Sequence, residues 1–158
     1  MDAGLRPHKP EDFESLYQLD QECYPPEIAY SRRMMRWYLR LPEADCLVAE
    51  NDGEIIGFIV TARENELGHV ITLDVAEAQR RRGVGTALLA EAEARLFEAG
   101  VRQVWLETAT NNLPAVAFWQ RHGYRTEALL KNYYADKIDA HEMRKRLTAN
   151  ETRDKSKP

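Results

Sequence analysis

Hydrophobic and polar residues alternate between His69 and Val75, and this segment is rich in β-branched residues, so it predicts a strand. Further along, apolar residues recur at every fourth position and predict one stripe of a helix: Val84, Leu88, Ala92 and Leu96. Between these two elements lies a short loop with three arginines and two glycines. We take this strand–loop–helix unit as the centre of the fold.

Apolar spacing and turn residues predict the other elements in the same way. Asp52-Gly53 between two apolar runs is a strong hairpin signal, and Gly100 is expected as the left-handed cap that ends the central helix. The expected strands are 5–8, 46–50, 54–63, 101–107, 124–130 and 140–147, and the expected further helices begin near residues 10, 32 and 114. We expect residues 131–136 to form a loop.

This order of elements predicts an α/β fold with a mixed, largely antiparallel sheet. We expect one domain over residues 1–147, followed by a polar tail over 148–158 that is disordered because it has almost no apolar residues.

Composition narrows the class of protein. The chain has 158 residues, of which 44% are hydrophobic and 30% charged, which suits one globular core. A net charge of -4 gives no bulk attraction to nucleic acid or to an anionic membrane. Cys23 and Cys46 lie far apart, and without a secretory context we expect them to be reduced. With no apolar signal core near the N-terminus, we expect a cytoplasmic protein.

The loop after the first predicted strand has an unusual charge. The first turn of a helix carries free N–H groups and a positive dipole end, so acidic residues are favoured there. This chain instead places Arg80, Arg81 and Arg82 at that end, next to Gly83 and Gly85. Free N–H groups, open backbone and positive side chains together describe an anion site that suits a pyrophosphate. A solvated basic turn, with glycines that serve only the bend, is the alternative.

Two common phosphate loops do not fit. A dinucleotide-binding fingerprint requires a third glycine where this chain has Leu88, and a P-loop requires a lysine that is absent between Arg63 and Lys131. The remaining pattern, Arg80-x-x-Gly83-x-Gly85, resembles the acetyl-CoA-binding motif of the GNAT superfamily of N-acetyltransferases. The resemblance extends over about residues 4–147 and implies a sheet with splayed central strands and flanking helices.

Further stretches resemble narrower families. Val104-Trp105-Leu106-Glu107, Asn112 with the helix up to Trp119, and Lys131-Asn132-Tyr133-Tyr134 are similar to the bacterial ribosomal-protein-alanine N-acetyltransferases (RimI-like). The opening of the strand at His69 also resembles catalytic subunits of archaeal and eukaryotic N-terminal acetyltransferases. The implied reaction is direct transfer of acetyl from acetyl-CoA to an amine, with the N-terminal α-amine of a protein as the expected acceptor.

The resemblance implies a set of residues for acetyl-CoA. They are Leu73, Asp74, Val75, Arg80, Arg81, Arg82, Gly83, Val84, Gly85, Thr86, Asn112 and Trp119. Amides of residues 81–86 would hold the pyrophosphate, and the Val75 N–H would stabilise negative charge on the thioester oxygen. Asn112 would contact the pantetheine arm, or would only cap its helix.

The amine must be neutral to attack, which sets the demand on a base. At pH 7 about one peptide α-amine in seven is neutral, against roughly one lysine side chain in 2500. An α-amine therefore needs only a modest base, and by resemblance Glu107 is the candidate, directly or through a water. A carboxylate at a strand end that merely pairs with a cation is the alternative.

The departing thiolate is where the sequence differs from the family pattern. Related enzymes have a tyrosine, assigned to protonating the CoA sulfur, at the position of Trp119. An indole N–H donates a hydrogen bond but is no practical acid. We expect Trp119 to contact the sulfur or to pack under the cofactor, and Tyr133 or Tyr134 to be a possible replacement acid.

The acceptor is expected between residues 24–33 and the loop after residue 130. Glu27 would hold the acceptor's N-terminus, and Tyr133 and Tyr134 would line its slot. His69 is expected as a strand-start residue rather than a catalytic one, and no cluster has the spacing of metal ligands. Two other functions stay open: acetylation of a small-molecule amine, and a CoA-binding module with little turnover. A monomer and a homodimer are equally compatible with the sequence.

Overall fold

The computed structural model describes residues 4–149, and within them seven strands form one sheet in the order β1-β2-β3-β4-β5-β7-β6. The strands are β1 (Gly4–Pro7), β2 (Ala44–Asn51), β3 (Glu54–Glu64), β4 (Leu67–Val75), β5 (Gln103–Ala109), β6 (Arg125–Tyr134) and β7 (Ile138–Arg146). The helices are α1 (Phe13–Cys23), α2 (Arg32–Leu39), α3 (Val84–Glu98) and α4 (Leu113–Arg121), with short 3-10 turns η1 (Pro10–Asp12) and η2 (Glu77–Gln79).

The predicted fold class and order of elements are confirmed. Every strand pair is antiparallel except β4–β5, which is parallel. Ser31 caps α2 by accepting a hydrogen bond from the Met34 N–H, and Gly100 follows α3 with a φ of 102°. The expected tail falls mostly outside the described residues.

The expected loop over residues 131–136 is wrong. Strand β6 continues to Tyr134, and the turn before β7 is only three residues long, Ala135–Lys137. The pairing of β6 with β7 is irregular between Leu130 and Tyr134, and the Asn132 N–H donates to the Asp139 carboxylate instead of to a strand partner. A bulge of this kind inserts residues without ending a strand, so the polar pair Lys131-Asn132 looks like a loop in the sequence.

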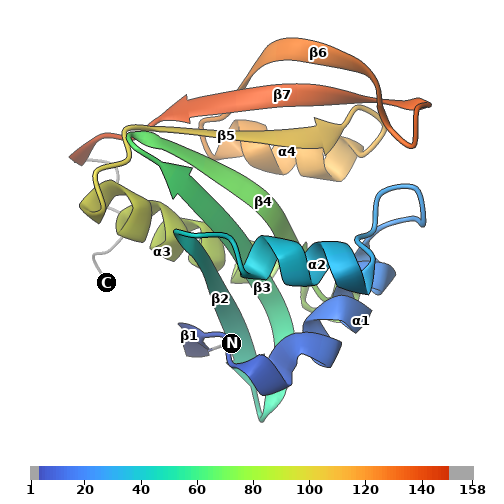
Figure 1. Ribbon diagram of the computed structural model, residues 1–158, viewed down its shortest axis with the longest axis vertical. Coiled ribbons are helices and arrows are strands. Elements are labelled where there is room, and N and C mark those ends of the chain that lie inside the picture. Colours follow the sequence, from blue (N-terminus) through green and yellow to red (C-terminus); the bar gives the residue numbers. More distant parts are fainter. Residues whose placement is uncertain (1–3, 150–158) are drawn as a thin grey trace.

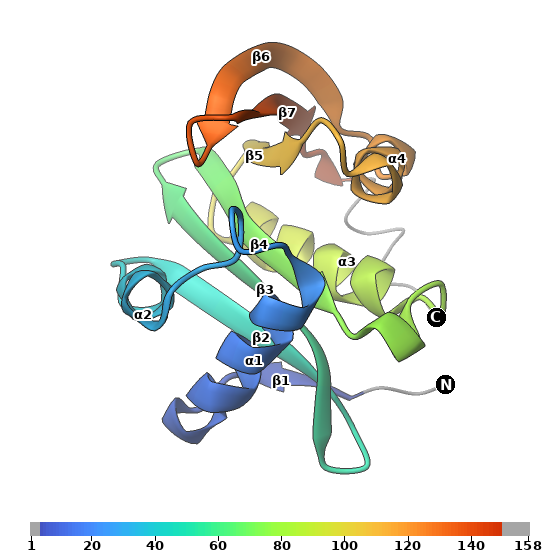
Figure 2. The same ribbon diagram turned by 90° about the vertical axis from the view of Figure 1, so that its right-hand side faces the viewer.

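The helices cover both faces of the sheet, α1 and α2 on one side and α3 and α4 on the other (Figure 2). Each face has its own apolar core. The core under α3 includes Leu88, Leu89, Val104, Leu106 and Met143, and the core under α1 and α2 includes Leu16, Met35, Phe58 and Val60. From α1, Leu16 is fully buried in the second core, and Phe13 and Tyr17 pack against the edge of that core.

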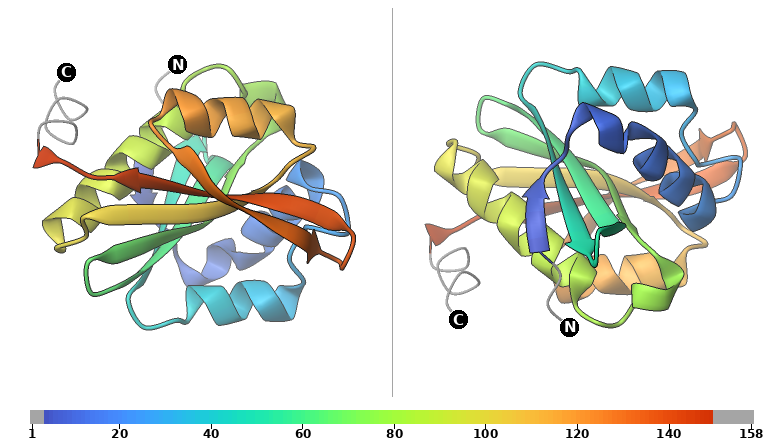
Figure 3. Two further views of the ribbon diagram at one scale, coloured as in Figure 1. Left: turned by 90° about the horizontal axis from the view of Figure 1, so that it is seen from above. Right: turned by 90° about the horizontal axis from the view of Figure 1, so that it is seen from below.

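The strands β4 and β5 separate soon after they begin. They pair over only three positions, from Leu67 opposite Gln103 to His69 opposite Trp105. Beyond that point β4 runs on with β3 while β5 runs with β7, and the two directions diverge (Figure 1). Figure 3 shows the β5-β7-β6 part lying across the β2-β3-β4 part. The splayed central strands expected from the family resemblance are therefore present.

A β-bulge lies in β4 next to this separation. The partners of β4 in β3 skip from Val70 to Thr72, which leaves Ile71 as the extra residue. Because side chains alternate along a strand, one extra residue exchanges the faces of all those that follow. Asp74 thereby comes to lie on the α1 side of the sheet, and Leu73 and Val75 pack against the core under α3.

A buried ion pair fixes α3 to β7. Lys145 Nζ lies 2.9 Å from Glu93 Oε1, and the Tyr124 hydroxyl donates to Glu93 Oε2 over 2.8 Å. Glu93 is 1% exposed and Lys145 7%. Charges buried to this degree are tolerable only together, because each alone would have no compensation for its lost hydration.

Replacing Lys145 with methionine should therefore lower the free energy of unfolding by about 3–5 kcal/mol, because the Glu93 carboxylate stays buried without its cation. Urea denaturation measures this loss. The double variant Glu93→Leu/Lys145→Met should recover most of it. Arg95→Met is the control, because Arg95 lies on α3 with Glu93 but its contacts with Glu91 and Asp45 are exposed. It should change the free energy of unfolding by less than about 1 kcal/mol. Equal losses in Lys145→Met and Arg95→Met would contradict the prediction.

Candidate active site

The edge of β4 that leaves β5 presents a row of backbone groups. Ala76 donates its N–H to the Ile56 carbonyl on β3, so alternate residues of β4 point their backbone groups to β3 and to the opened side. Three carbonyls on the opened side accept from side chains: Ile71 from Tyr30, Leu73 from Tyr24, and Val75 from Cys23 and Arg80. The carbonyl side of the gap is thus satisfied from within the chain.

The N–H groups of Leu73 and Val75 lie on the same opened side of β4 as these carbonyls. A residue in an antiparallel strand points its N–H and its carbonyl to the same side, so the Leu73 and Val75 N–H groups also face the opened side. The side chains that reach this edge of β4, from Tyr24, Tyr30, Cys23 and Arg80, contact its carbonyl oxygens and not these N–H groups. Leu73 and Val75 therefore offer donors to a ligand with acceptor atoms, as an amide-rich arm or a thioester oxygen has.

The loop before α3 has the geometry of an anion site. The first hydrogen bond within α3 runs from the Ala87 N–H to the Gly83 carbonyl, so the N–H groups of the preceding residues point out of the helix end. Gly83 has a φ of 84°, which favours glycine. A Cβ at Gly85 would lie 3.4 Å from Phe118, an ordinary contact, so the packing of α3 does not by itself demand glycine there. No acidic residue stands in the first turn of α3, and free N–H groups at a helix end of this kind suit a pyrophosphate.

The three arginines of the loop differ in what they contact. Arg80 folds back, and its Nε donates to the Val75 carbonyl over 3.1 Å. Arg81 adopts a positive φ of 64°, a conformation that a non-glycine residue rarely takes. Within residues 4–149, the side chains of Arg81 and Arg82 have no hydrogen-bond or ion-pair partner, and both residues are exposed. Positive charge is therefore available at the helix end, from two of the three arginines.

Glu107 lies on β5 just beyond the last residue that pairs with β4. Its Oε1 is 2.8 Å from His69 Nε2, and its Oε2 accepts from the Tyr133 hydroxyl over 3.0 Å. The side chain of Glu107 is 12% exposed and that of His69 23%. The His69 ring stacks on Trp105 at 3.9 Å between centroids, which fixes its orientation toward the carboxylate. Three strands thus meet at one carboxylate.

Tyrosines surround Glu107 on the side away from α3. Tyr134 contacts Tyr133 edge-on at 4.8 Å, and Tyr30 contacts Tyr38 of α2 at 5.1 Å between ring centroids. Burial, and after it the charge of Glu107, raises the pKa of Tyr133 and of Tyr134 well above the ordinary value. Both phenols therefore stay protonated at neutral pH and act as hydrogen-bond donors.

Trp119 and Asn112 have structural contacts that the sequence left open. Trp119 is 7% exposed and belongs to the core under α3, where it meets the Tyr124 ring edge-on. The Asn112 side chain accepts from the Ala115 N–H over 3.2 Å and so caps α4. Thr86, at the start of α3, has its hydroxyl 3.1 Å from His122 at the end of α4. The C-terminal end of α4 therefore lies beside the start of α3.

Two segments face each other across the tyrosine side of the site. Glu27, in the segment between α1 and α2, lies 3.8 Å from Lys137 Nζ in the turn between β6 and β7. Both side chains are largely solvated, so this ion pair contributes little stability and opens easily.

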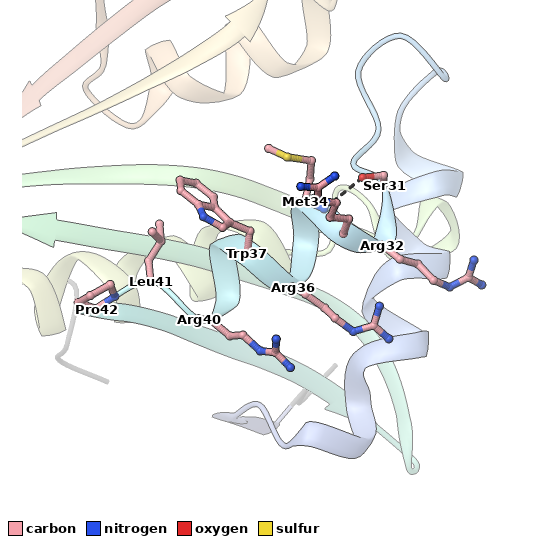
Figure 4. A pocket seen from close by; sticks show the side chains of 9 residues that line it. Ser31, Arg32, Met34, Arg36, Trp37, Arg40, Leu41 and Pro42 are labelled. Atoms are coloured by element: carbon pink, nitrogen blue, oxygen red, sulfur yellow. Dashed lines mark hydrogen bonds between the residues drawn. The ribbon is translucent and has the colours of Figure 1, made fainter.

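The apolar surface continues from these tyrosines onto α2. Met34 is 41% exposed and Trp37 56%, and Trp37 contacts Tyr38 at 5.1 Å. Figure 4 shows the residues that line a pocket at α2, with Met34, Trp37 and Leu41 on one side of the helix and Arg32, Arg36 and Arg40 on the other. Arg32 and Arg36 lie over the rings of Tyr17 and Phe13, so they join α2 to α1.

Sequence reasoning missed part of this arrangement. It treated His69 as a strand-start residue, whereas the structure brings it to Glu107. It also gave no role to Tyr24 and Tyr30, which close the carbonyl row of β4. No sequence pattern marked His69, because its contact with Glu107 depends on the parallel pairing of β4 with β5, which aligns His69 with Trp105 and sets Glu107 two residues beyond.

The described residues offer neither a metal cluster nor a membrane-spanning helix. In residues 4–149 no group of three or more His, Cys, Asp or Glu side chains is arranged to hold a metal ion. None of the helices in that range is long and apolar enough to cross a membrane. Cys23 and Cys46 are free thiols.

Comparison with known proteins agrees with this geometry. Residues 13–124 match the Acetyltransferase (GNAT) family. An N-alpha-acetyltransferase from Sulfurisphaera tokodaii is 34% identical over 119 residues, 67% of this chain and 71% of the relative. The crystal structure of Ard1 from Thermoplasma volcanium has a TM-score of 0.86 at 29% identity, covering 94% of this chain and 99% of that one.

The fold is also that of the ribosomal-protein-S18-alanine N-acetyltransferase from Escherichia coli, with a TM-score of 0.84 at 21% identity over 93% of this chain and 95% of the other. The family resemblance of the sequence is confirmed. The chain belongs to the GNAT family of acetyl-CoA-dependent N-acetyltransferases.

Proposed function

We propose that the chain acetylates the N-terminal α-amine of a protein or peptide in the cytoplasm, with Glu107 as the base. The observation that carries the proposal is the Glu107 carboxylate, held between His69 and Tyr133 where β4 and β5 separate. The names of similar proteins support the acceptor, since one relative is an N-alpha-acetyltransferase. The acetyl group arrives as the thioester of acetyl-CoA, which this family uses.

On the cofactor side, the chain's own groups are donors. The N–H groups at the start of α3, with Arg81 and Arg82, hold the pyrophosphate. The Leu73 and Val75 N–H groups bind along the opened edge of β4, and the Val75 N–H lies where negative charge develops on the thioester oxygen. The remaining proposed contacts are Val84, Thr86 and Asn112, of which Asn112 has its amide nitrogen left to donate. Asp74, with its buried side chain on the α1 side, contributes by positioning Leu73 and Val75.

On the acceptor side, charge and aromatic surface guide the peptide. Glu27 exchanges Lys137 for the ammonium of the incoming N-terminus, and Tyr133 and Tyr134 line the slot that leads to Glu107. Glu107 takes the proton of the ammonium, directly or through a water, and His69 keeps the carboxylate aimed at the gap. Since a peptide α-amine titrates near ~7.8, this proton transfer needs only a modest base.

The sulfur leaves without a dedicated acid in this proposal. Tyr133 and Tyr134 have raised pKa values, which makes either phenol a weak proton donor to a thiolate. A thiol titrates near ~8.5, so CoA can leave as a thiolate that is stabilised by hydrogen bonds. Trp119, which is buried beside Phe118 and Tyr124, supports the cofactor by packing.

An acceptor panel tests the proposal. We expect acetylation of a peptide with a free N-terminus, a large loss when the same N-terminus is blocked and only a lysine side chain is left, and little activity on amino acids or polyamines. Mass spectrometry identifies the acetylated nitrogen. Activity confined to small amines would support a small-molecule acetyltransferase instead, and tight acetyl-CoA binding with no acetylated acceptor would support a CoA-binding module.

Replacing Glu107 with glutamine should reduce kcat about 100-fold at pH 7 and leave the acetyl-CoA Kd unchanged, because a general base contributes at least that factor. The loss should shrink as the pH rises past ~7.8, where solvent supplies the neutral amine. His69→Gln should show a smaller loss with the same pH trend. Glu127→Gln, on the exposed face of β6, is the matched control. A pH-independent loss in Glu107→Gln would remove the base role.

Trp119→Tyr should fold, bind acetyl-CoA and turn over, because tyrosine keeps an aromatic ring in the core next to Tyr124. The smaller ring should cost about 1 kcal/mol of stability. Thermal unfolding, calorimetric titration with CoA and steady-state rates measure the three properties. A folded variant that no longer binds CoA would show that the indole itself shapes the cofactor site.

A further inference from the structure

Two buried carboxyl groups join the acceptor side of the site to the cofactor side. Asp20, on α1, has no exposed surface, and Asp74, on β4, is 1% exposed. Asp20 Oδ2 accepts from the Tyr30 N–H over 2.8 Å, and Asp74 Oδ1 accepts from the Thr72 hydroxyl over 2.7 Å. The other two oxygens, Asp20 Oδ1 and Asp74 Oδ2, are buried and have no hydrogen-bond donor.

These two oxygens can serve each other only through a proton. The two carboxyl groups act on each other's pKa, and the contacts of Cys23 and Tyr24 with β4 bring the end of α1 against the strand that carries Asp74. Ionised carboxylates only accept hydrogen bonds, so two of them side by side repel and leave both oxygens unsatisfied. One proton held between them makes one group a donor and the other its acceptor, and satisfies both oxygens at once.

We propose that Asp20 and Asp74 share one proton and that this bridged pair positions the acceptor segment against the acetyl-CoA strand. The role in the reaction rests on the proposed function of the site. Asp20 holds the Tyr30 backbone, at the end of the segment that contains Glu27, while Asp74 lies between Leu73 and Val75. Both aspartates are positioning residues, since neither faces the reacting atoms.

Other contacts join the same two segments. The Tyr24 hydroxyl donates to the Leu73 carbonyl over 2.9 Å, and the Cys23 thiol donates to the Val75 carbonyl over 3.5 Å. If the two carboxylates repelled each other and displaced α1, the backbone of β4 would loosen at Leu73 and Val75, where the thioester lies in our proposal. Tyr30 would move with α1, because Asp20 holds its N–H. The shared proton is the element of this joint that depends on pH.

The surroundings favour retention of the proton. The titratable groups facing the pair from the packed elements are Cys23, Tyr24, Tyr30, Cys46 and Arg80. Arg80 is the cation among them and favours ionisation of Asp74, but burial and the neighbouring Asp20 outweigh it and raise the pKa of Asp74. Because the folded pKa lies above the unfolded one, the stabilisation by this proton is complete at acidic pH and is lost as the pH rises through the folded pKa.

Carbon-detected NMR of protein labelled with 13C at aspartate carboxyls tests the shared proton directly. We expect the Asp20 and Asp74 signals, assigned from the Asp20→Asn and Asp74→Asn variants, to retain one proton between them at pH 7, while exposed aspartates ionise near ~3.9. In Asp20→Asn the amide donates in place of the proton, so Asp74 should be ionised. Full ionisation of both groups by pH 6 in the wild type would overturn the proposal.

The functional readout uses the same substitution. Asp20→Ala removes the bridge and should raise the KM for an acceptor peptide about tenfold, a loss typical of one charge-assisted hydrogen bond, with a smaller change in kcat. Asp20→Asn should restore the KM and keep it flat at alkaline pH, where the wild-type KM should rise. Asp52→Asn, at an exposed position in the turn between β2 and β3, is the control.

Equal KM values for Asp20→Ala and Asp20→Asn would overturn the positioning role, even where the NMR result holds. If no peptide is acetylated by any variant, the proposed function fails, and the NMR titration still decides whether the proton is shared. Thermal unfolding from pH 6 to pH 10 gives a check without substrate: the wild type should lose stability on the alkaline side more than Asp20→Asn does.

Discussion

The structure depends on the separation of β4 from β5. Two strands that pair over three residues and then part leave backbone groups in the middle of a sheet without their usual partners. Buried backbone groups must find partners, so the gap has to be filled by side chains, by solvent or by a ligand. Here side chains serve the carbonyl groups of β4, through Tyr24, Tyr30 and Cys23, and the N–H groups are left for solvent or a ligand.

The same separation explains the crowding of polar groups in α1. The segment from Asp20 to Tyr30 supplies donors to three carbonyls of β4 and carries a buried carboxylate opposite Asp74. The bulge at Ile71 puts Asp74 on this side, since without the extra residue its side chain would point toward α3. An irregularity in β4 therefore places the carboxyl group of Asp74 on the side of α1 and not on the side of α3.

Much of this fold could be predicted because its signals each lie within a short stretch of the sequence. The alternation from His69, the arginine–glycine loop and the apolar stripe of α3 each depend on neighbours in the sequence, and all three are in place. Residues 131–134 were wrongly predicted as part of a loop because Lys131 and Asn132 are polar. The strand is held by pairing with β7 on either side of them, at Leu130 and at Tyr134. The contact of His69 with Glu107 joins residues 38 positions apart and requires the register of two strands, which no periodicity encodes.

The two hydrogen bonds of the Glu107 carboxylate bear on which acceptor amine the site suits. His69 and Tyr133 hold both carboxylate oxygens, and hydrogen bonds of this kind fix the geometry of a charged group as well as stabilise its charge. In our proposal Glu107 is the base, and a carboxylate is a weak base that suits a substrate which gives up its proton readily. A peptide α-amine titrates near ~7.8 and a lysine side chain near ~10.4, so any one base removes a proton from the first at a cost smaller by about 3.5 kcal/mol. A carboxylate base in this position is thus better matched to an α-amine than to lysine.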